Sequence, residues 1–327
     1  MKSRNANIDA AKGAGILLVV LGHAVQHNIA GFDNILFRII YSFHMPLFMF
    51  LSGCVAKYGN SASITKNIYR LVIPFIAWYI VAGLVQWGLT GHPPDVGSYL
   101  LGLFKTPDAG LWFLWVLYLC HVVFYLMSQA QKFIGIAGAI VIFLLVQVLP
   151  GSILGFSLLK WHFVFFIAGY LFIRYQSSFS KWKYILMVVA TISWLLLFPF
   201  WEFVDNERFL NAMAHLPGFI SNHARLLERV FRYAVAFAGI GMALSVVYLL
   251  IPFKKGLALL GLYTLEIYVS HQLLLDLSFG PNTTVKIITC FIDALVLSLL
   301  LAFILKKIPY INTLLYGMPL NKESRKK

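Results

Sequence analysis

Charged residues are scarce in this chain, in which Asp, Glu, Lys and Arg together make up only 12% of the sequence. A soluble domain averages about 25%. Hydrophobic residues account for 60%, and apolar runs long enough to cross about 30 Å of hydrocarbon recur along the sequence. The low charge excludes an ordinary soluble domain and predicts an all-α polytopic membrane protein.

Acidic residues are the rarest of the charged ones, with 12 Asp and Glu against 26 Lys and Arg. The resulting net charge of +14 invites comparison with nucleic-acid-binding proteins. The basic residues, however, lie in short loops between apolar runs, a pattern that reflects membrane topology and contact with anionic headgroups. We therefore expect membrane lipids as partners and no nucleic acid. The three cysteines all lie in apolar segments, which favours neither a disulfide framework nor a metal site.

The apolar runs predict about ten transmembrane helices in a single domain over residues 1–310, followed by a basic cytoplasmic tail over residues 311–327. The predicted spans are 13–30, 34–56, 68–90, 109–127, 133–149, 153–173, 183–201, 229–251, 257–278 and 285–306. Of the 26 basic residues, 18 fall on the face that holds the N-terminus, and an even number of spans returns the C-terminus to that face. The positive-inside rule then places both termini in the cytoplasm.

Several ionisable side chains interrupt the predicted spans. Each costs at least about 2.5–3.5 kcal/mol near the bilayer centre, so each needs a cavity, a partner or a chemical role. They are His23, Arg38, His44, His121, Lys160, His162, Glu266, His271 and Asp293. His121 and Asp293 have no neighbouring pattern, and we expect them to form interhelical hydrogen bonds.

The stretch KGAGILLVVLGHA places Lys12 and His23 eleven residues apart. On a helix this spacing leaves the two side chains about 20° apart in azimuth and about 16 Å apart along the axis. One helix face therefore carries a cation at the cytoplasmic end and an imidazole near mid-membrane, and glycines at 13, 15 and 22 allow close approach by neighbours. The alternative is a structural His23 that forms an interhelical hydrogen bond, with Lys12 as an ordinary positive-inside residue.

The second and third spans carry further candidates. His44 lies two residues before Pro46, so a kinked helix with a histidine at the kink is expected there, either as the wall of a site or as a simple interhelical contact. Ser52 and Gly53 close this span at the cytoplasmic side. Arg70 begins the third span, and a guanidinium at that position suits either phosphate binding or a plain topological role.

The stretch GLYTLEIYVSHQ places Glu266 and His271 in the ninth predicted span. Five residues correspond to about 140° around a continuous helix, so the two do not form a side-by-side pair. The polar stretch Glu202–Glu228, rich in aromatic, histidine and arginine residues, is a candidate acceptor surface or else an ordinary interfacial loop.

An ordered set of motifs resembles the acyltransferase-3 family of integral-membrane O-acyltransferases, which includes enzymes that acetylate bacterial surface polysaccharides. The matching stretches are IDAAKGAGILLVVLGHA at 8–24, FHMPLFMFLSG at 43–53, YRLVIPF at 69–75, LWFLWVLY at 111–118, HFVFFIAGYL at 162–171 and YTLEIYVSH at 263–271. Lys12 and His23 match the family's basic residue and histidine, with lysine in place of the more familiar arginine, and Arg70 matches its arginine before a proline.

The resemblance implies an acyltransferase of the bacterial inner membrane that moves an acetyl group from cytoplasmic acetyl-CoA to a polysaccharide or lipid-linked glycan such as lipopolysaccharide O-antigen. His23 would act as general base, with His44, Glu266 and His271 as further candidate catalytic residues. Lys12, Arg70, Ser52 and Gly53 would bind the acetyl-CoA donor, no metal is required, and polysaccharide-assembly proteins are possible partners. Two alternatives stay open: a transporter or flippase for a lipid-linked sugar, and a structural subunit of a polysaccharide-assembly complex.

Overall fold

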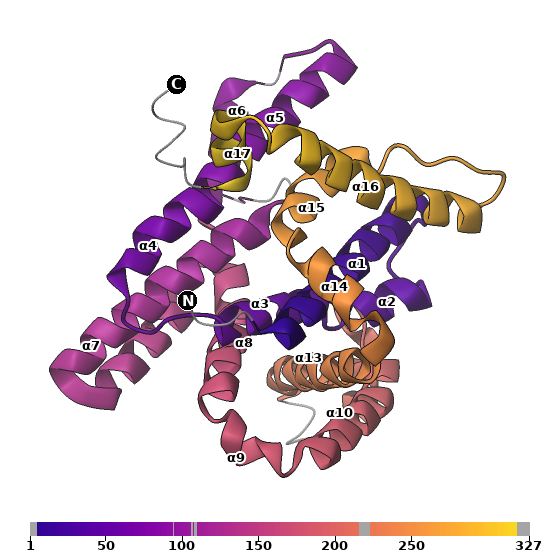
Figure 1. Ribbon diagram of the computed structural model, residues 1–327. Helices are drawn as coiled ribbons and strands as arrows, with labels where there is room; N and C mark the ends of the chain where they lie inside the picture. Colours follow the sequence, from indigo (N-terminus) through magenta and orange to yellow (C-terminus); the bar gives the residue numbers. More distant parts are fainter. Residues whose placement is uncertain (1–4, 94, 106, 108–109, 216–222, 319–327) are drawn as a thin grey trace. The chain divides into compact units, whose positions relative to one another are not determined.

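The computed structural model describes residues 5–318 except 94, 106, 108–109 and 216–222. Every regular element in the described part of the chain is helical (Figure 1), as the composition predicts. The chain forms two compact units. The first unit comprises Met1–Leu51, Leu171–Thr264 and Leu274–Val296, and the second comprises Ser52–Tyr170, Leu265–Leu273 and Leu297–Lys327.

The first unit is built around the N-terminal helix and the helices that follow residue 171. Its elements are α1 (Ala6–Asn28), α2 (Ile35–Tyr41), α9 (Gln176–Ser180), α10 (Lys183–Leu197), η2 (Phe198–Phe200), α11 (Glu207–Ala214), α13 (Ala224–Leu249), η3 (Ile251–Phe253) and α14 (Lys254–Gly261). Three long helices have residues in both units: α3 (His44–Cys54), α8 (Phe156–Arg174) and α16 (Thr283–Leu305).

The second unit contains most of the middle of the chain and its C-terminal helix. Its elements are α4 (Ser61–Asn67), the π-helical turn η1 (Ile68–Val72), α5 (Ile73–Thr90), α6 (Val96–Lys105), α7 (Trp112–Val148), α8 (Phe156–Arg174), α15 (Thr264–Ser270), η4 (His271–Leu274) and α17 (Pro309–Tyr316). Helix α17 places the start of the predicted tail in a packed element, because Leu315 and Tyr316 are buried. Residues 319–327 of that tail lie outside the described residues.

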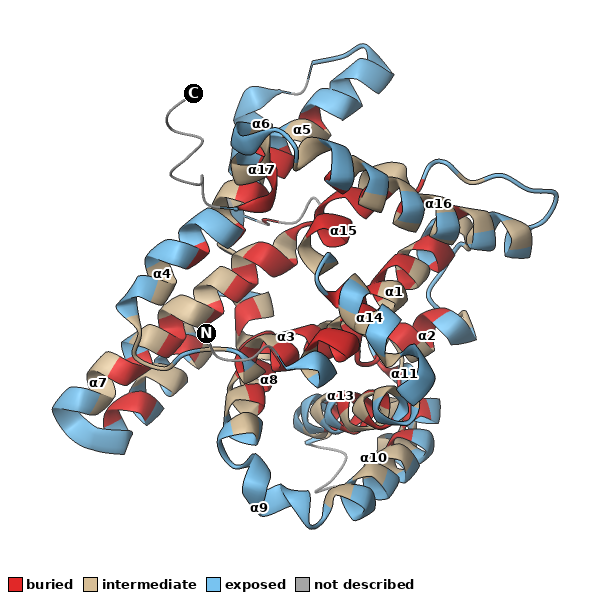
Figure 2. Ribbon diagram, viewed as in Figure 1, coloured by how far each residue is buried: buried red, intermediate tan, exposed pale blue. Residues whose placement is uncertain are grey.

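Eight helices among the described residues are long and apolar enough to cross a membrane, or nine if the broken pair Ile251–Gly261 and Thr264–Leu274 counts as one span. Together with the all-helical fold, this supports a multi-pass membrane protein. Many of these helices expose apolar side chains. Helix α10, for example, buries only Trp194 and is exposed along most of its length (Figure 2). A lipid-facing helix has this character, whereas a surface helix of a soluble protein would present polar side chains there.

Helix α7 covers two of the predicted spans, 109–127 and 133–149. Its backbone leaves the helical conformation at Ile134 and Gly135, where Gly135 has φ 65° and ψ −156°. A side chain would strain that conformation, which glycine adopts readily. A Cβ added to Gly138 would lie 2.3 Å from the carbonyl oxygen of Ala130, so the two arms pass close together beside the turn, as Figure 1 shows. The single long helix is therefore a hairpin of two arms.

Helix α1 packs against α14 with almost no side chain between the two backbones. A Cβ on Gly13 would lie 1.9 Å from the carbonyl oxygen of Leu257, and a Cβ on Gly261 would lie 1.9 Å from that of Asp9. Each glycine thus lies against the backbone of the other helix. A larger residue at either position would require the backbones to move apart. The expectation that glycines in α1 permit close approach is confirmed at Gly13.

The sequence predicts one continuous helix for the ninth span, 257–278, and this prediction is wrong. The helix ends at Gly261 and restarts at Thr264, whose hydroxyl donates to the Gly261 carbonyl at 2.8 Å. Because Gly261 is held against α1, the chain turns at residues 262–263 and begins a new short helix, and His271 then lies in the 3₁₀ turn η4. The angle of about 140° expected between Glu266 and His271 therefore does not apply.

We predict that Gly13→Ala and Gly261→Ala lower the melting temperature of the purified protein in detergent by several degrees. Overpacking of this kind costs about 1–3 kcal/mol. Gly256→Ala is the matched control, because nothing lies within 4 Å of a Cβ there and alanine favours a helix. Thermal unfolding followed by tryptophan fluorescence measures the difference; equal melting temperatures for all three variants would contradict the backbone contact.

Candidate active site

Helix α1 carries Lys12 and His23, which the sequence predicts to lie on one face of a helix. It runs without interruption from Ala6 to Asn28, so Lys12 and His23 share a face about 16 Å apart along its axis. Both side chains are half-buried. Asn5 caps the helix by accepting a hydrogen bond from the Asn7 backbone N–H at 3.0 Å, which satisfies one of the free N–H groups of the first turn.

The imidazole of His23 contacts α2. Its Nδ1 lies 3.3 Å from the hydroxyl oxygen of Tyr41, and the same hydroxyl donates to Oε1 of Gln26 at 2.7 Å. Gln26 follows His23 on α1 by three residues, so the two side chains lie side by side on that helix. The contact is close because Gly22 has no side chain: a Cβ there would come within 3.1 Å of the Tyr41 ring.

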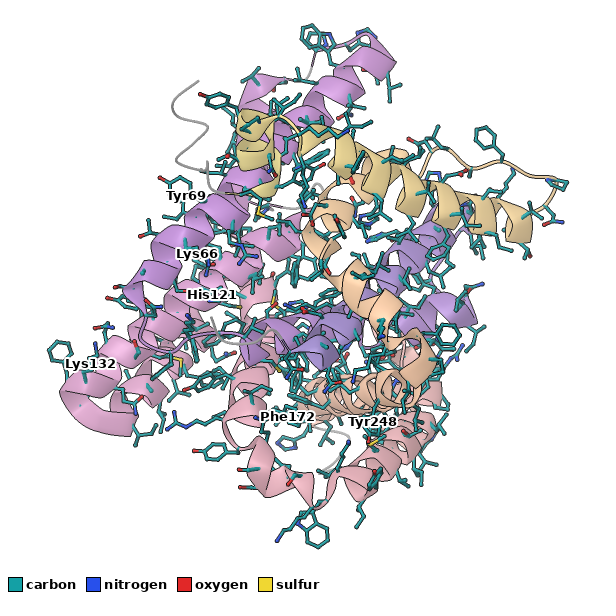
Figure 3. All side chains as sticks on the ribbon, in the orientation of Figure 1. Lys66, Tyr69, His121, Lys132, Phe172 and Tyr248 are labelled. Carbon is teal, nitrogen blue, oxygen red and sulfur yellow. The ribbon has the colours of Figure 1, made fainter. Side chains whose placement is uncertain are left out.

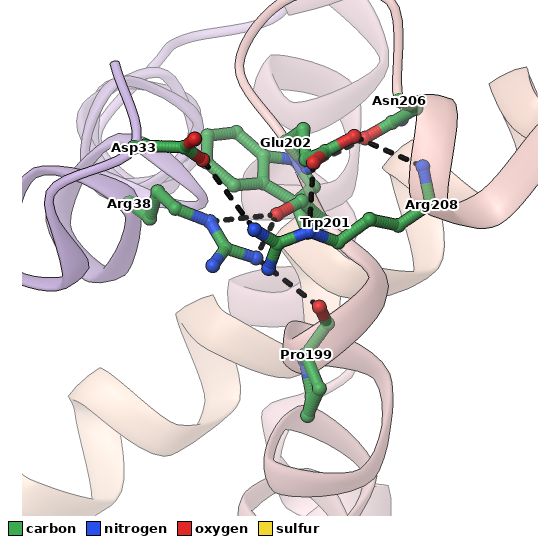
Figure 4. A network of polar contacts seen from close by, with 7 residues as sticks. All are labelled: Asp33, Arg38, Pro199, Trp201, Glu202, Asn206 and Arg208. Carbon is green, nitrogen blue, oxygen red and sulfur yellow. Dashed lines mark hydrogen bonds and ion pairs between the residues drawn. The ribbon is translucent and has the colours of Figure 1, made fainter. Parts of the chain in front are cut away.

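Arg38 holds the helix that carries Tyr41. It is 5% exposed, and its guanidinium donates to the backbone carbonyl of Trp201 at 3.0 Å and to that of Pro199 at 3.1 Å (Figure 4). Arg38 is one of the ionisable residues of a predicted span that need a cavity, a partner or a role, and these carbonyls are its partners. The arginine thereby fixes α2 to the segment that follows α10.

The same figure shows a second arginine on the neighbouring segment. Arg208 forms an ion pair with Glu202 at 2.8 Å and reaches Asp33 at 3.5 Å. Asn206 accepts from the Glu202 backbone N–H at 2.6 Å and thereby closes the turn. The first part of the candidate acceptor surface, Glu202–Glu228, is therefore internally ordered by polar contacts, while its residues 216–222 lie outside the described residues.

His44 is the first residue of α3, and the break between α2 and α3 falls at residues 42–43. The expected histidine at a kink is confirmed, and Pro46 lies in the first turn of the new helix, where its missing N–H costs nothing. The Nδ1–H of His44 donates to the Ile40 carbonyl at 2.9 Å, since that carbonyl can only accept. Its ring lies edge-on to Tyr41 at 4.6 Å between centroids.

In the second unit, Glu266 is 1% exposed and pairs with Lys306, which follows α16. Lys306 is one of the 18 basic residues counted above on the face of the N-terminus, and that count predicted only a topological role for it. A carboxylate so deeply buried is costly unless it is paired, so the lysine supplies the charge that Glu266 requires.

The Nδ1 atoms of His271 and His162 bond to backbone carbonyls about one turn earlier in the chain. The Nδ1–H of His271 donates to the carbonyls of Ile267 and Tyr268 at 3.0 and 2.8 Å, and the Nδ1–H of His162 donates to that of Leu158 at 2.9 Å. His44 likewise bonds to the carbonyl four residues earlier, that of Ile40 in α2. His23 differs, because its Nδ1 contacts a side chain from another helix.

Arg70 lies in the π-helical turn η1 and is exposed. Such turns occur frequently at functional sites. Gly317, with φ 63°, sits against this turn, because a Cβ there would lie 2.4 Å from the Tyr69 carbonyl oxygen. Figure 3 labels Lys66 and Tyr69 on the α4–η1 segment and His121 on α7 nearby; His121 lies within electrostatic reach of Arg70 and packs edge-on to Phe166 at 5.1 Å.

Ser52 and Gly53 lie in the last turn of α3, in the second unit. A Cβ on Gly53 would lie 1.9 Å from the Phe166 carbonyl oxygen of α8, so close helix packing by itself accounts for glycine at this position. Ser52 is half-buried. Donor binding by these two residues stays a prediction.

The structure therefore divides the predicted site residues between the units. Lys12, His23 and His44 lie in the first unit; Ser52, Gly53, Arg70, Glu266 and His271 lie in the second. In the first unit His23 and His44 both contact Tyr41. The contact of Tyr41 with the two histidines was not predicted from the sequence, although its position three residues before His44 could have indicated it. The ion pair between Lys306 and Glu266 was not predicted either. Across the described residues, no group of three or more His, Cys, Asp or Glu side chains is placed to hold a metal ion.

Comparison with known proteins gives a consistent result. Residues 5–307 match a family model described as an acyltransferase domain. The chain is 32% identical over 183 residues to the nodulation protein NolL of Sinorhizobium fredii, covering 52% of this chain and 49% of that protein. It is 26% identical over 214 residues to NolL of Mesorhizobium japonicum, covering 61% and 57%. The chain thus spans about half the length of the curated relatives it matches. No solved structure matches it.

We predict that Lys306→Met destabilises the protein by about 3–5 kcal/mol, because it leaves the buried Glu266 carboxylate without its counter-charge. The neighbouring Lys307 is exposed, so Lys307→Met should change stability by no more than about 0.5 kcal/mol. The double variant Glu266→Gln, Lys306→Met should recover most of the loss. Detergent melting curves test this, and equal curves for Lys306→Met and Lys307→Met would refute the pairing.

Proposed function

The chain belongs to the acyltransferase-3 family, and we propose that it is an O-acetyltransferase that moves an acetyl group from cytoplasmic acetyl-CoA to a sugar hydroxyl of a surface polysaccharide. The proposal starts from the coarser finding that the chain is a multi-pass membrane acyltransferase. The observation that carries the finer assignment is the placement of His23, whose imidazole shares a helix face with Lys12 and is oriented by Tyr41. The acceptor is O-antigen or a similar glycan, presented as polysaccharide or on a lipid carrier.

We place the enzyme in the bacterial inner membrane with ten spans and both termini in the cytoplasm. The two arms of α7 and the broken pair α14–α15 support this count, because each corresponds to a predicted span. The positive-inside distribution of basic residues supports the orientation. In this arrangement residues 1–310 form the acyltransferase domain, residues 311–327 face the cytoplasm, and polysaccharide-assembly proteins are the expected partners.

The donor would bind at the cytoplasmic face. Lys12 and Arg70 are the cations that would hold the phosphates of CoA, and the exposure of Arg70 on its π-helical turn supports that role. Ser52 and Gly53 are the other two candidates for donor binding. The pantetheine arm would extend along the α1 face from Lys12 towards His23, over the separation of about 16 Å set by the helix rise.

His23 would remove the proton from the acceptor hydroxyl as that oxygen attacks the thioester carbonyl carbon. The C–O bond forms, the C–S bond breaks as the tetrahedral intermediate collapses, and the proton passes from the imidazolium to the departing thiolate. General-base assistance of this kind contributes about 10²–10⁴-fold. We assign His44, Glu266 and His271 supporting roles in binding the acceptor or stabilising the oxyanion.

We predict that His23→Ala abolishes O-acetylation of the surface glycan while the glycan is still exported. The control is His92→Ala, since His92 is an exposed loop residue. Mass spectrometry of glycan from cells carrying each variant measures acetylation and identifies the acetylated sugar. Unchanged acetylation in His23→Ala would refute the catalytic assignment, and loss of export would favour a transporter or flippase.

We further predict that Lys12→Ala raises KM for acetyl-CoA by about tenfold or more, because a hydrogen bond to a charged group contributes about 1.5–3 kcal/mol. Lys12→Arg should retain most of the affinity. Lys286→Ala removes an exposed lysine from the start of α16 and serves as the control. Kinetics with isolated membranes and labelled acetyl-CoA test the donor role, which fails if all four proteins share one KM.

A further inference from the structure

The hydroxyl of Tyr41 lies between two side chains of α1, and its single proton can serve only one of them. The partner at 2.7 Å is Oε1 of Gln26, a carbonyl oxygen that can only accept. The hydroxyl proton therefore points to Gln26. The contact at 3.3 Å with Nδ1 of His23 must then have the imidazole N–H as donor and the Tyr41 oxygen as acceptor.

This direction of donation fixes the tautomer of neutral His23, with the proton on Nδ1 and the lone pair on Nε2. We propose that Tyr41 is a positioning residue that presents Nε2 of His23 as the basic atom, and that Gln26 sets the direction of the hydrogen bonds. This inference rests on the proposed function. It adds two residues to the site and identifies the reacting nitrogen.

Tyr41 is held firmly enough to orient the imidazole. Its ring stacks on Phe37 with centroids 3.8 Å apart and meets Phe203 edge-on at 5.3 Å. The His44 ring covers a third side, with its centroid 4.6 Å from that of Tyr41. Gly22, which has no side chain, leaves room for the Tyr41 ring beside α1. These contacts on three sides hold the ring with its hydroxyl towards α1.

The helix that carries Tyr41 is fixed as well. Arg38 stands three residues earlier and is bonded to the carbonyls of Pro199 and Trp201, so α2 cannot rotate without breaking those bonds. Phe203, which contacts the Tyr41 ring, follows the same segment. Arg38 therefore secures both the helix that carries Tyr41 and one of the surfaces that packs against it.

A phenol suits this position better than the carboxylate that orients histidines in many soluble enzymes. A further ionised side chain near mid-membrane would cost at least about 2.5–3.5 kcal/mol. The neutral hydroxyl accepts the same Nδ1–H without adding a charge. During the reaction Nε2 takes the acceptor proton and gives it to the departing thiolate, while the Nδ1 proton stays on its bond to Tyr41.

The first test is Tyr41→Phe, which keeps the packed ring and removes only the hydroxyl. We expect kcat to fall about 10–100-fold, the usual effect of losing a group that orients a functional histidine, with KM for acetyl-CoA within twofold of the wild type. Tyr184→Phe is the control, because Tyr184 lies on α10 and is 67% exposed. Rates are measured as transfer from labelled acetyl-CoA to the glycan fraction of isolated membranes.

The second test reads the tautomer directly and needs no acceptor. Nitrogen-15 NMR of protein labelled at histidine distinguishes protonated from unprotonated ring nitrogens, and the His23 signals are those lost in His23→Asn. The wild type should show a protonated Nδ1 and an unprotonated Nε2. Gln26→Leu should reverse this pattern, since the freed Tyr41 proton then turns to Nδ1, whereas Gln26→Glu should preserve it.

Each outcome decides one question. A wild-type His23 protonated at Nε2, or a Tyr41→Phe variant with unchanged kcat and tautomer, overturns the positioning role and leaves the proposed reaction standing. The expected NMR pattern in a protein that transfers no acetyl group would instead overturn the proposed reaction. Should Tyr41→Phe fold poorly, Gln26→Leu decides, because Gln26 is exposed and its replacement disturbs no core.

Discussion

The interior of a bilayer supplies no hydrogen-bond partners, so every polar side chain of a span must be satisfied by the protein itself. At Nδ1, His44, His162 and His271 meet this demand through a carbonyl about one turn earlier in the chain. Arg38 and Glu266 meet it through backbone carbonyls and a lysine. Against this pattern His23 stands apart, because its orientation depends on a side chain of a different helix. A histidine whose direction is set by tertiary packing can be aimed, which is what a base requires.

The contact between α1 and α14 determines much of what surrounds that histidine. Reciprocal glycines at 13 and 261 bring the two backbones together and fix the N-terminal half of α1. The same contact ends α14 and separates it from α15. One pair of residues without side chains thus positions the helix that carries Lys12 and His23 and also interrupts the predicted ninth span.

The sequence was sufficient for features that depend on local periodicity. The phase of Lys12 and His23, the break beside His44 and the two arms of α7 follow from helical geometry, proline and the lengths of the apolar runs. The contact of Tyr41 with His23 could not be predicted, because it depends on how α2 lies across α1. The pairing of Lys306 with Glu266 was hidden for another reason: a lysine at the end of a span is fully explained by topology, so nothing in the sequence called for a second role.

That ion pair bears on how the protein enters the membrane during synthesis. The segment with Glu266 emerges from the ribosome well before Lys306, so the carboxylate is made before its counter-charge. Only when the last apolar helix has inserted does the counter-charge arrive. The charge pairing of α15 is therefore completed only by the lysine that follows α16, so a chain that ended before Lys306 would leave Glu266 without this counter-charge.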